Sequence, residues 1–150
     1  MLEHSAAQWM TENGFNPESI DGEGKHQDTA LILACRRGEA AVVDALLAAG
    51  AAVNCRNMDG TSALWAACVA DDFSIAERLL EHGADIDNQN DNGATVLMYA
   101  ASNGKEPWVR FLLQAGADAT LRSLDDYTAL DLANTVDILR LLRADRQARN

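Results

Sequence analysis

The chain has 150 residues, a formal net charge of −11 at pH 7, and 48% hydrophobic but only 5% aromatic residues. Its length suits one domain of ordinary size, and its apolar residues are mostly the small and aliphatic ones that closely packed helices need. The negative charge argues against binding to nucleic acid, whose affinity comes largely from phosphate neutralisation, and it also disfavours anionic membrane surfaces. A basic protein partner is compatible with this charge.

The cysteines and the first residues bear on the compartment. Three cysteines without Cys-x-x-Cys spacing favour a reducing environment such as the cytoplasm. The first residues, MLEHSAAQWMTENG, lack the basic and apolar segments of a signal peptide. No apolar run reaches the roughly 18 residues that a membrane-spanning helix requires. We therefore expect a cytoplasmic protein without membrane contact.

A short helix is predicted near the beginning of the chain, over residues 5–13. Ser5 is a candidate N-cap, and Gly14 is placed to end the helix. The segment resembles the second half of a two-helix repeat whose first half is missing, which predicts an N-terminal cap over residues 1–23. Residues 15–27 are polar and Gly-rich, and are predicted to form a loop.

From residue 24 onward the chain repeats every 33 residues, and a period of this size is typical of a stack of repeats. Full repeats are predicted over 24–56, 57–89 and 90–122, followed by a truncated capping repeat over 123–142 and a polar basic tail over 143–150. The positions that keep the step are a hydroxyl residue, a leucine pair and a glycine: Thr29, Ser62, Thr95 and Thr128; Leu46-Leu47, Leu79-Leu80 and Leu112-Leu113; Gly50, Gly83 and Gly116.

Each repeat is predicted to contain a short helix, a tight turn and a longer helix that ends at a glycine. In the first repeat these helices cover 29–37 and 40–49. The second repeat has Asp71 and Asp72 at its interhelix turn instead of glycine, and Asp tolerates the left-handed conformation better than most residues. The long helix of the third repeat begins near Pro107, which suits a first turn. The last repeat lacks about four residues at this turn, and its polar outer side is typical of a C-terminal cap.

The third repeat carries the fullest set of motif residues: Gly93, Thr95, Leu97, Ala100, Ala101, Gly104, Leu112, Leu113, Gly116, Ala117 and Asp118. On these residues the chain resembles the ankyrin repeat family, whose repeat opens with Gly-x-Thr-Pro-Leu-His-x-Ala-Ala. The resemblance covers residues 24–142 and implies an all-α, ankyrin-type helix-turn-helix solenoid with projecting β-hairpin-like loops. The motif's Pro and His are absent from all four repeats, so we expect weaker ties between helix and loop, because the family's His supplies such a tie.

The resemblance implies that partner proteins contact the loop tips and the inner face of the short helices, with the first tip formed by Lys25, His26 and Asp28. The candidate partner-binding residues are Arg36, Arg37, Met58, Asp59, Thr61, Trp65, Val69, Asp91, Asn92, Ser102, Asn103, Leu124, Asp125 and Tyr127. Met58, Trp65 and Tyr127 are larger than a solvated loop needs, which favours a binding hot spot. Packing between neighbouring repeats is the alternative for Trp65 and Tyr127.

Catalytic and metal-binding patterns are missing from the sequence. His4, His26 and His82 are scattered, and no Cys/His cluster is present, so we expect no metal, no cofactor and no catalysis. The expected function is monomeric protein–protein interaction, as an adaptor or an inhibitor. Self-assembly through the apolar tips or through the arginines of residues 140–149 is an alternative, as is a small-ligand site or an active site that the sequence does not reveal. Cys35, Cys68 and Trp108 are predicted to lie in the core.

Overall fold

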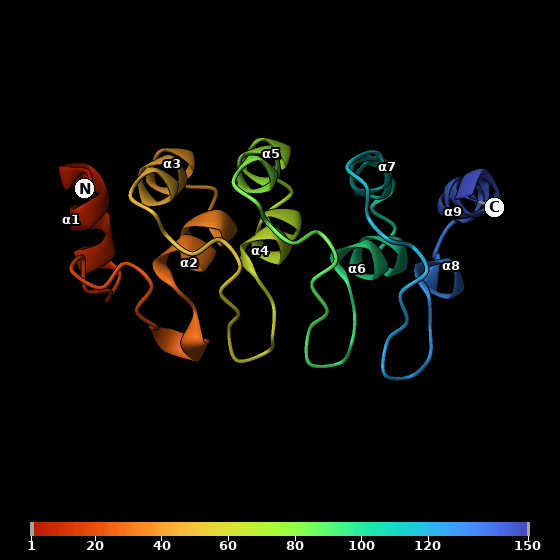
Figure 1. Cartoon of the computed structure of the whole chain (residues 1–150), viewed down its shortest axis with the longest axis horizontal. Coiled ribbons are helices and arrows are strands. Elements are labelled where there is room, and N and C mark those ends of the chain that lie inside the picture. Colours follow the sequence, from red (N-terminus) through yellow and green to blue (C-terminus); the bar gives the residue numbers. More distant parts are fainter. Residues whose placement is uncertain (1, 150) are drawn as a thin grey trace. The chain divides into compact units, whose positions relative to one another are not determined.

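The computed structural model describes residues 2–149, and within them it is helical, which confirms the all-α fold class (Figure 1). No strand forms among these residues, and an isolated antiparallel bridge joins Glu23 to Thr29. The elements in chain order are α1 (His4–Glu12), η1 (Lys25–Gln27), α2 (Ala30–Arg36), α3 (Ala40–Ala48), α4 (Ala63–Val69), α5 (Phe73–Glu81), α6 (Val96–Ser102), α7 (Glu106–Gln114), α8 (Ala129–Leu132) and α9 (Val136–Arg149).

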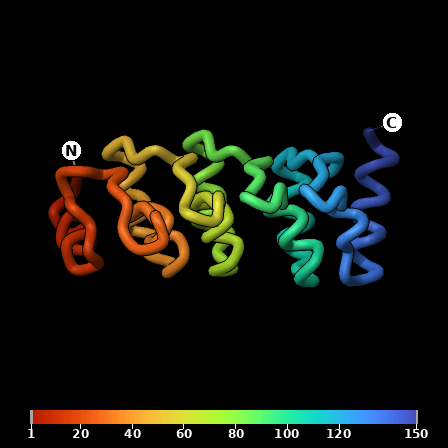
Figure 2. Tube along the Cα trace, turned by 90° about the horizontal axis from the view of Figure 1, so that it is seen from below, coloured from red at the N-terminus to blue at the C-terminus, as the bar shows by residue number. Residues whose placement is uncertain are grey.

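The chain divides into two compact units, of which unit 1 ends at Asp85 and unit 2 begins at Ile86. In unit 1, the short helices α2 and α4 pack side by side, the long helices α3 and α5 form a second layer, and α1 packs against α3. In unit 2, α6 packs against α8 and α7 against α9 in the same way. Within each unit the loops project from the side of the short helices (Figure 1), and the helix pairs follow one another in chain order when the trace is seen from below (Figure 2).

The hydroxyl residues that recur every 33 positions are the N-caps of the short helices. The side chains of Thr29, Thr95 and Thr128 each accept a hydrogen bond from the backbone N–H three residues later, at 3.3, 3.2 and 3.2 Å. Ser62 occupies the same N-cap position without such a side-chain bond. At Thr128 the side chain of Asp131 bonds back to the N-cap backbone and completes a capping box. These bonds explain why each short helix begins where it does, since the first turn of a helix leaves backbone donors without intrahelical partners.

The turn between the two helices of a repeat requires a left-handed residue. Gly38 and Gly104 both have φ of +70° at this turn, and Asp71 adopts φ of +63° at the equivalent position of the second repeat. Asp72 then caps α5 by accepting a hydrogen bond from the Ile75 backbone at 3.0 Å. The prediction that this aspartate pair replaces a glycine turn is therefore confirmed.

Loops that follow the long helices are tied to one another by a repeated side-chain bond. A side-chain oxygen in one loop accepts from a backbone N–H in the loop that follows the next long helix, 31 residues later, and the acceptors are spaced by 33 residues. The bonds run from Ala52 to Asp21 at 2.9 Å and from Asp85 to Asn54 at 2.8 Å in unit 1, and from Asp118 to Asp87 at 2.8 Å in unit 2. The bonds fix the spacing of neighbouring loops within each unit.

Two details differ from the sequence-based predictions. Helix α1 begins at His4 with Glu3 as its N-cap, so the N-cap assignment of Ser5 is wrong; the Ser5 hydroxyl donates to the Glu3 carboxylate instead. Helix α9 continues to Arg149, so the predicted polar tail is helical as far as it is described. Arg149 donates to the carbonyl oxygen of Ala117 at 3.1 Å, which ties the end of this helix to the preceding loop.

Buried side chains fill the layer between the short and long helices. Cys35 and Cys68 are both fully buried, and Trp108 is 1% exposed. All three residues were predicted to lie in the core, and the structure confirms these positions.

Candidate functional site

The loop tips are built on a polar residue that recurs every 33 positions. The Asn57 side-chain oxygen accepts from the backbone N–H groups two and four residues later, at 3.0 and 3.1 Å, and from the Thr61 hydroxyl at 2.9 Å. Asn90 accepts from the two equivalent N–H groups at 3.0 and 2.9 Å. Ser123 replaces Asn in the next tip and accepts one such bond, at 3.2 Å. The shape of each tip is therefore held by its own first residue.

Neighbouring tips are also joined within each unit. In unit 1 the Met58 N–H donates to the His26 carbonyl oxygen at 2.9 Å, and in unit 2 the Leu124 N–H donates to the Asn92 carbonyl oxygen at 2.9 Å. Gly93 makes the second contact possible: it has φ of +75°, and a Cβ at this position would lie 2.8 Å from the Leu124 nitrogen. The tips are therefore preformed surfaces rather than free loops.

Large apolar side chains are exposed at these tips. Met58 is 54% exposed and Val69 50% in unit 1, while Leu124 is 77% and Tyr127 51% exposed in unit 2. Among residues 2–149 Val136 is the one other large apolar side chain exposed to this degree, at 62%. The four tip and short-helix residues all belong to the set predicted to contact a partner.

Trp65 does not share this exposure. It is 6% exposed and packs in the core of unit 1, so the expectation that it contributes to an exposed binding patch is wrong, and the alternative of packing between repeats describes it. The equivalent positions of neighbouring repeats, Ile32 and Met98, are 1% and 2% exposed. This register position faces the interior in each repeat, and its apolar character in three repeats is the signal that could have identified it.

The other candidate residues lie mainly at the surface. Thr61 is half-buried because it bonds to Asn57. The exposed members are Arg36, Arg37, Asp59, Asp91, Asn92, Ser102, Asn103 and Asp125. The structure brings them to the loop side of their own unit, where each remains a prediction for partner contact.

Unit 1 contains a groove of about 550 Å³ between the end of α1, the first tip and α2, which we call the α1–α2 groove. Its lining consists of Glu12, Asn13, Gly14, Phe15, Gly24, Lys25, His26, Asp28, Leu33, Arg36 and Arg37. Three of the residues predicted at the first tip and both arginines of α2 therefore share one surface with the N-terminal cap. The sequence did not indicate that Phe15 belongs to this surface.

Asp28 is the most buried charged group of this groove, at 5% exposure. Arg36 donates to its two carboxylate oxygens at 2.6 and 3.2 Å, and the Asn57 amide donates to Oδ1 at 3.0 Å. Burial acts to raise the pKa of Asp28, but the hydrogen bonds from Arg36 and Asn57 outweigh it and the pKa is lowered. The same contact raises the pKa of Arg36. This network joins the first tip, α2 and the second tip.

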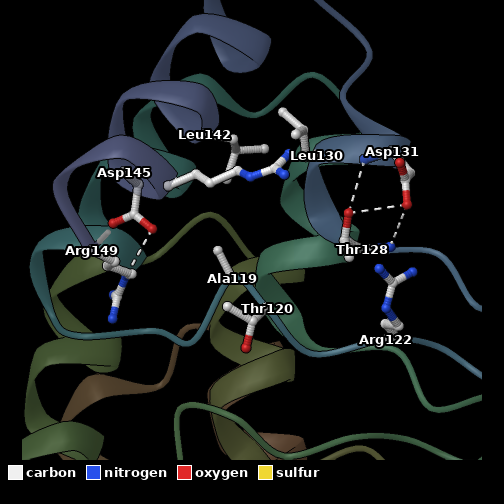
Figure 3. A pocket seen from close by; sticks show the side chains of 10 residues that line it. Ala119, Thr120, Arg122, Thr128, Leu130, Asp131, Leu142, Asp145 and Arg149 are labelled. Atoms are coloured by element: carbon white, nitrogen blue, oxygen red, sulfur yellow. Dashed lines mark hydrogen bonds and ion pairs between the residues drawn. The ribbon is translucent and has the colours of Figure 1, made fainter.

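A smaller groove of about 300 Å³ lies in unit 2 between α8, α9 and the loop before them. Figure 3 shows Leu130, Leu142 and Ala119 between two polar pairs, Thr128 with Asp131 and Asp145 with Arg149. The Arg149 Nε lies 2.9 Å from the Asp145 carboxylate. Hydrogen bonds from Thr128 lower the pKa of Asp131. The charged groups of this groove largely satisfy one another.

Chemistry-bearing clusters were also sought. Residues 2–149 contain no group of three or more His, Cys, Asp or Glu side chains that could hold a metal ion.

In the described part of the chain, no helix combines the length and apolar character needed to cross a membrane.

The stacked helix pairs and preformed tips define a helical repeat protein. A family model described as ankyrin repeats (3 copies) matches residues 2–90, and another described as ankyrin repeats (many copies) matches residues 69–133. The chain belongs to the ankyrin repeat family. A comparison with curated proteins gave no match. Ankyrin repeats are generic protein–protein interaction modules and are typically non-catalytic.

Proposed function

We propose that this protein is a non-catalytic adaptor or inhibitor that binds a partner protein through its loop tips and short helices. One observation carries the proposal. Of the five large apolar side chains that are at least half exposed in residues 2–149, four lie at tip or short-helix positions. Such side chains cost free energy in water and release it when a partner covers them.

The geometry of the tips also favours binding. The hydrogen bonds from Asn57 and Asn90 hold the tips in one shape before a partner arrives. A preformed surface loses little conformational entropy on association, so more of the contact free energy is retained as affinity. The exposed polar tip residues, such as Asp59 and Asp91, would then form the rim of the interface.

The test uses one variant for each unit. Met58→Ser/Val69→Ser removes the exposed apolar side chains of unit 1, and Leu124→Ser/Tyr127→Ser removes those of unit 2. Val136→Ser is the matched control, because Val136 is equally exposed but lies at the beginning of α9. Circular dichroism and thermal unfolding establish that each variant is folded.

Partner proteins are then captured from an extract of the native host with each immobilised protein. We expect a protein that is retained by the wild type and by Val136→Ser, and lost from at least one of the tip variants. Retention by all four proteins would contradict the tip surface. Light scattering over a concentration series separates partner binding from association of copies through the same side chains, because only the latter makes the wild-type mass rise with its own concentration.

A further inference from the structure

We propose that the α1–α2 groove of unit 1 binds an acidic segment of a partner protein that also carries an apolar side chain. This inference rests on the proposed function, and it names the chemistry of the partner at one defined place. The groove is the wider of the two described above, and it lies wholly within unit 1.

The distribution of charge in unit 1 singles out this groove. Residues 1–85 contain 14 Asp and Glu residues but only five Lys and Arg residues. Three of those five cationic residues, Lys25, Arg36 and Arg37, line the groove, and only two of the 14 acids do. His26 adds a fourth group that can carry positive charge. The groove is therefore a cationic patch on an otherwise strongly acidic unit, and an acidic segment would be drawn to this patch and repelled elsewhere.

The internal contacts leave much of this charge available. Arg36 is engaged by Asp28, so that pair contributes little net charge. Arg37 donates to the side-chain oxygen of Asn13, which is a neutral acceptor. Within the described residues Lys25 has no ion pair, and its side chain lies on an exposed residue. Lys25 and Arg37 therefore face the groove with charges that only Glu12 opposes.

An apolar wall lies beside these cations. The Phe15 ring stacks on Trp9 with centroids 6.4 Å apart and is held in place, and Leu33 of α2 is half-buried in the same groove. Gly24 approaches the ring so closely that a Cβ there would lie 2.8 Å from Phe15 Cε1. The bond from Met58 to His26 places the exposed Met58 on the neighbouring tip. An apolar side chain among the acids of the partner would find contacts on this wall.

The groove of unit 2 does not offer the same combination. Arg149 pairs with Asp145 at 2.9 Å, and Arg122 lies 3.5 Å from the Asp126 carboxylate. Asp131 faces Arg146 across that groove and opposes its charge. The cationic excess is therefore specific to the α1–α2 groove.

The experiment begins with random peptides displayed on phage, selected on the immobilised full chain. The most enriched peptide is synthesised with a fluorescent label, and its affinity is measured by anisotropy. The binding variant is Lys25→Glu/Arg37→Glu. The control is Arg140→Glu/Arg143→Glu on the exposed side of α9, which changes the net charge of the chain by the same amount. Lys25→Glu alone provides a second variant that leaves the bond between Arg37 and Asn13 intact.

We expect the enriched peptides to carry an excess of Asp and Glu together with an apolar residue. The affinity should fall at least about tenfold in Lys25→Glu/Arg37→Glu, because two attractions become repulsions, and Lys25→Glu alone should show a smaller fall. The control should change it less than about threefold, since exposed charges farther than a Debye length from the ligand are largely screened. Added salt should weaken wild-type binding.

Three results would overturn the inference: no enrichment on the wild type, enriched peptides without acidic excess, or equal losses in the groove variant and the α9 control. None of these results touches the proposed function, which depends on the separate loss of a captured partner from the tip variants. If capture fails in those variants while acidic peptides do not bind, the tip surface stands and the groove assignment falls.

Discussion

Asp28 and Arg36 form a two-point ion pair that joins the first loop tip to helix α2, with oxygen–nitrogen distances of 2.6 and 3.2 Å. The pair is extended to the second tip by the amide of Asn57. At the position where the ankyrin motif carries its His, this repeat has the buried Ile32. The tie between helix and loop that the His would supply is thus provided in unit 1 by a different set of side chains.

Replacing Asp28 should destabilise unit 1 in a pH-dependent way. Asp28→Asn is expected to lower the free energy of unfolding at pH 7 by about 1 to 2 kcal/mol, toward the low end for bonds to charged groups because Arg36 is partly exposed. The pKa of Asp28 is lowered in the folded state. Its stabilisation is therefore complete above the unfolded carboxyl pKa of about 3.9 and is lost as the pH falls through the folded pKa.

Urea unfolding of wild type and Asp28→Asn at pH 7 and at about pH 3 measures this effect. The gap between the two proteins should narrow at the lower pH. Asp125→Asn is the control, because this exposed tip residue should change stability by less than about 0.5 kcal/mol. A gap that stays the same at both pH values would show that the charge of Asp28 does not act as described.

Gly93 and Gly116 separate the cost of a left-handed conformation from the cost of a steric clash. Both have positive φ in unit 2, but only at Gly93 would a Cβ approach another residue, the Leu124 backbone at 2.8 Å. Gly116→Ala should cost about 1 kcal/mol through backbone strain. Gly93→Ala should cost at least about 1 kcal/mol more, since the neighbouring tip must move. Urea unfolding of the two variants gives the comparison, and equal losses would contradict the close approach of the two tips.

Ser123 offers a stabilising substitution. Asn57 and Asn90 each accept two backbone bonds at the equivalent position, whereas Ser123 accepts one. Ser123→Asn should add the missing bond and raise the stability by about 0.5 to 1.5 kcal/mol. Ser123→Ala, which removes the existing bond, should move the urea midpoint in the opposite direction. If the two variants shifted the midpoint together, the tip would not depend on this side chain.

The three cysteines should differ in reactivity. Burial, with a further contribution from the charge of Asp72, raises the pKa of Cys35 to about 12, and Cys68 is fully buried. Cys55 is only half-buried, and burial raises its pKa as well. Because the thiolate is the reactive form, a disulfide reagent at pH 8 should modify Cys55 slowly in the native protein and all three thiols in denaturant. Native-state modification of Cys35 at a rate similar to that of Cys55 would indicate that the short-helix layer opens.

The repeat architecture is determined locally, and the sequence alone therefore predicts it. An N-cap such as Thr29 and a left-handed turn residue such as Asp71 act within a few residues of their own position. Their recurrence every 33 residues predicts the helix pairs, and the predicted tip positions include the exposed apolar residues Met58 and Leu124. The tip acceptors Asn57 and Asn90 could have been found as well, because each precedes a glycine by three residues at the same 33-residue step.

Contacts between distant residues were decided only by the tertiary structure. Trp65 is buried because the packing of α4 in unit 1 covers it, and nothing in its immediate sequence distinguishes that from exposure. Asp28 meets Asn57 across 29 residues, and Phe15, Lys25 and Arg37 meet in one groove although each lies on a different element. Hydrogen bonds and ion pairs form over a few ångströms of space whatever the separation along the chain, so the periodic pattern predicts the scaffold, and the packing decides which side chains share a surface.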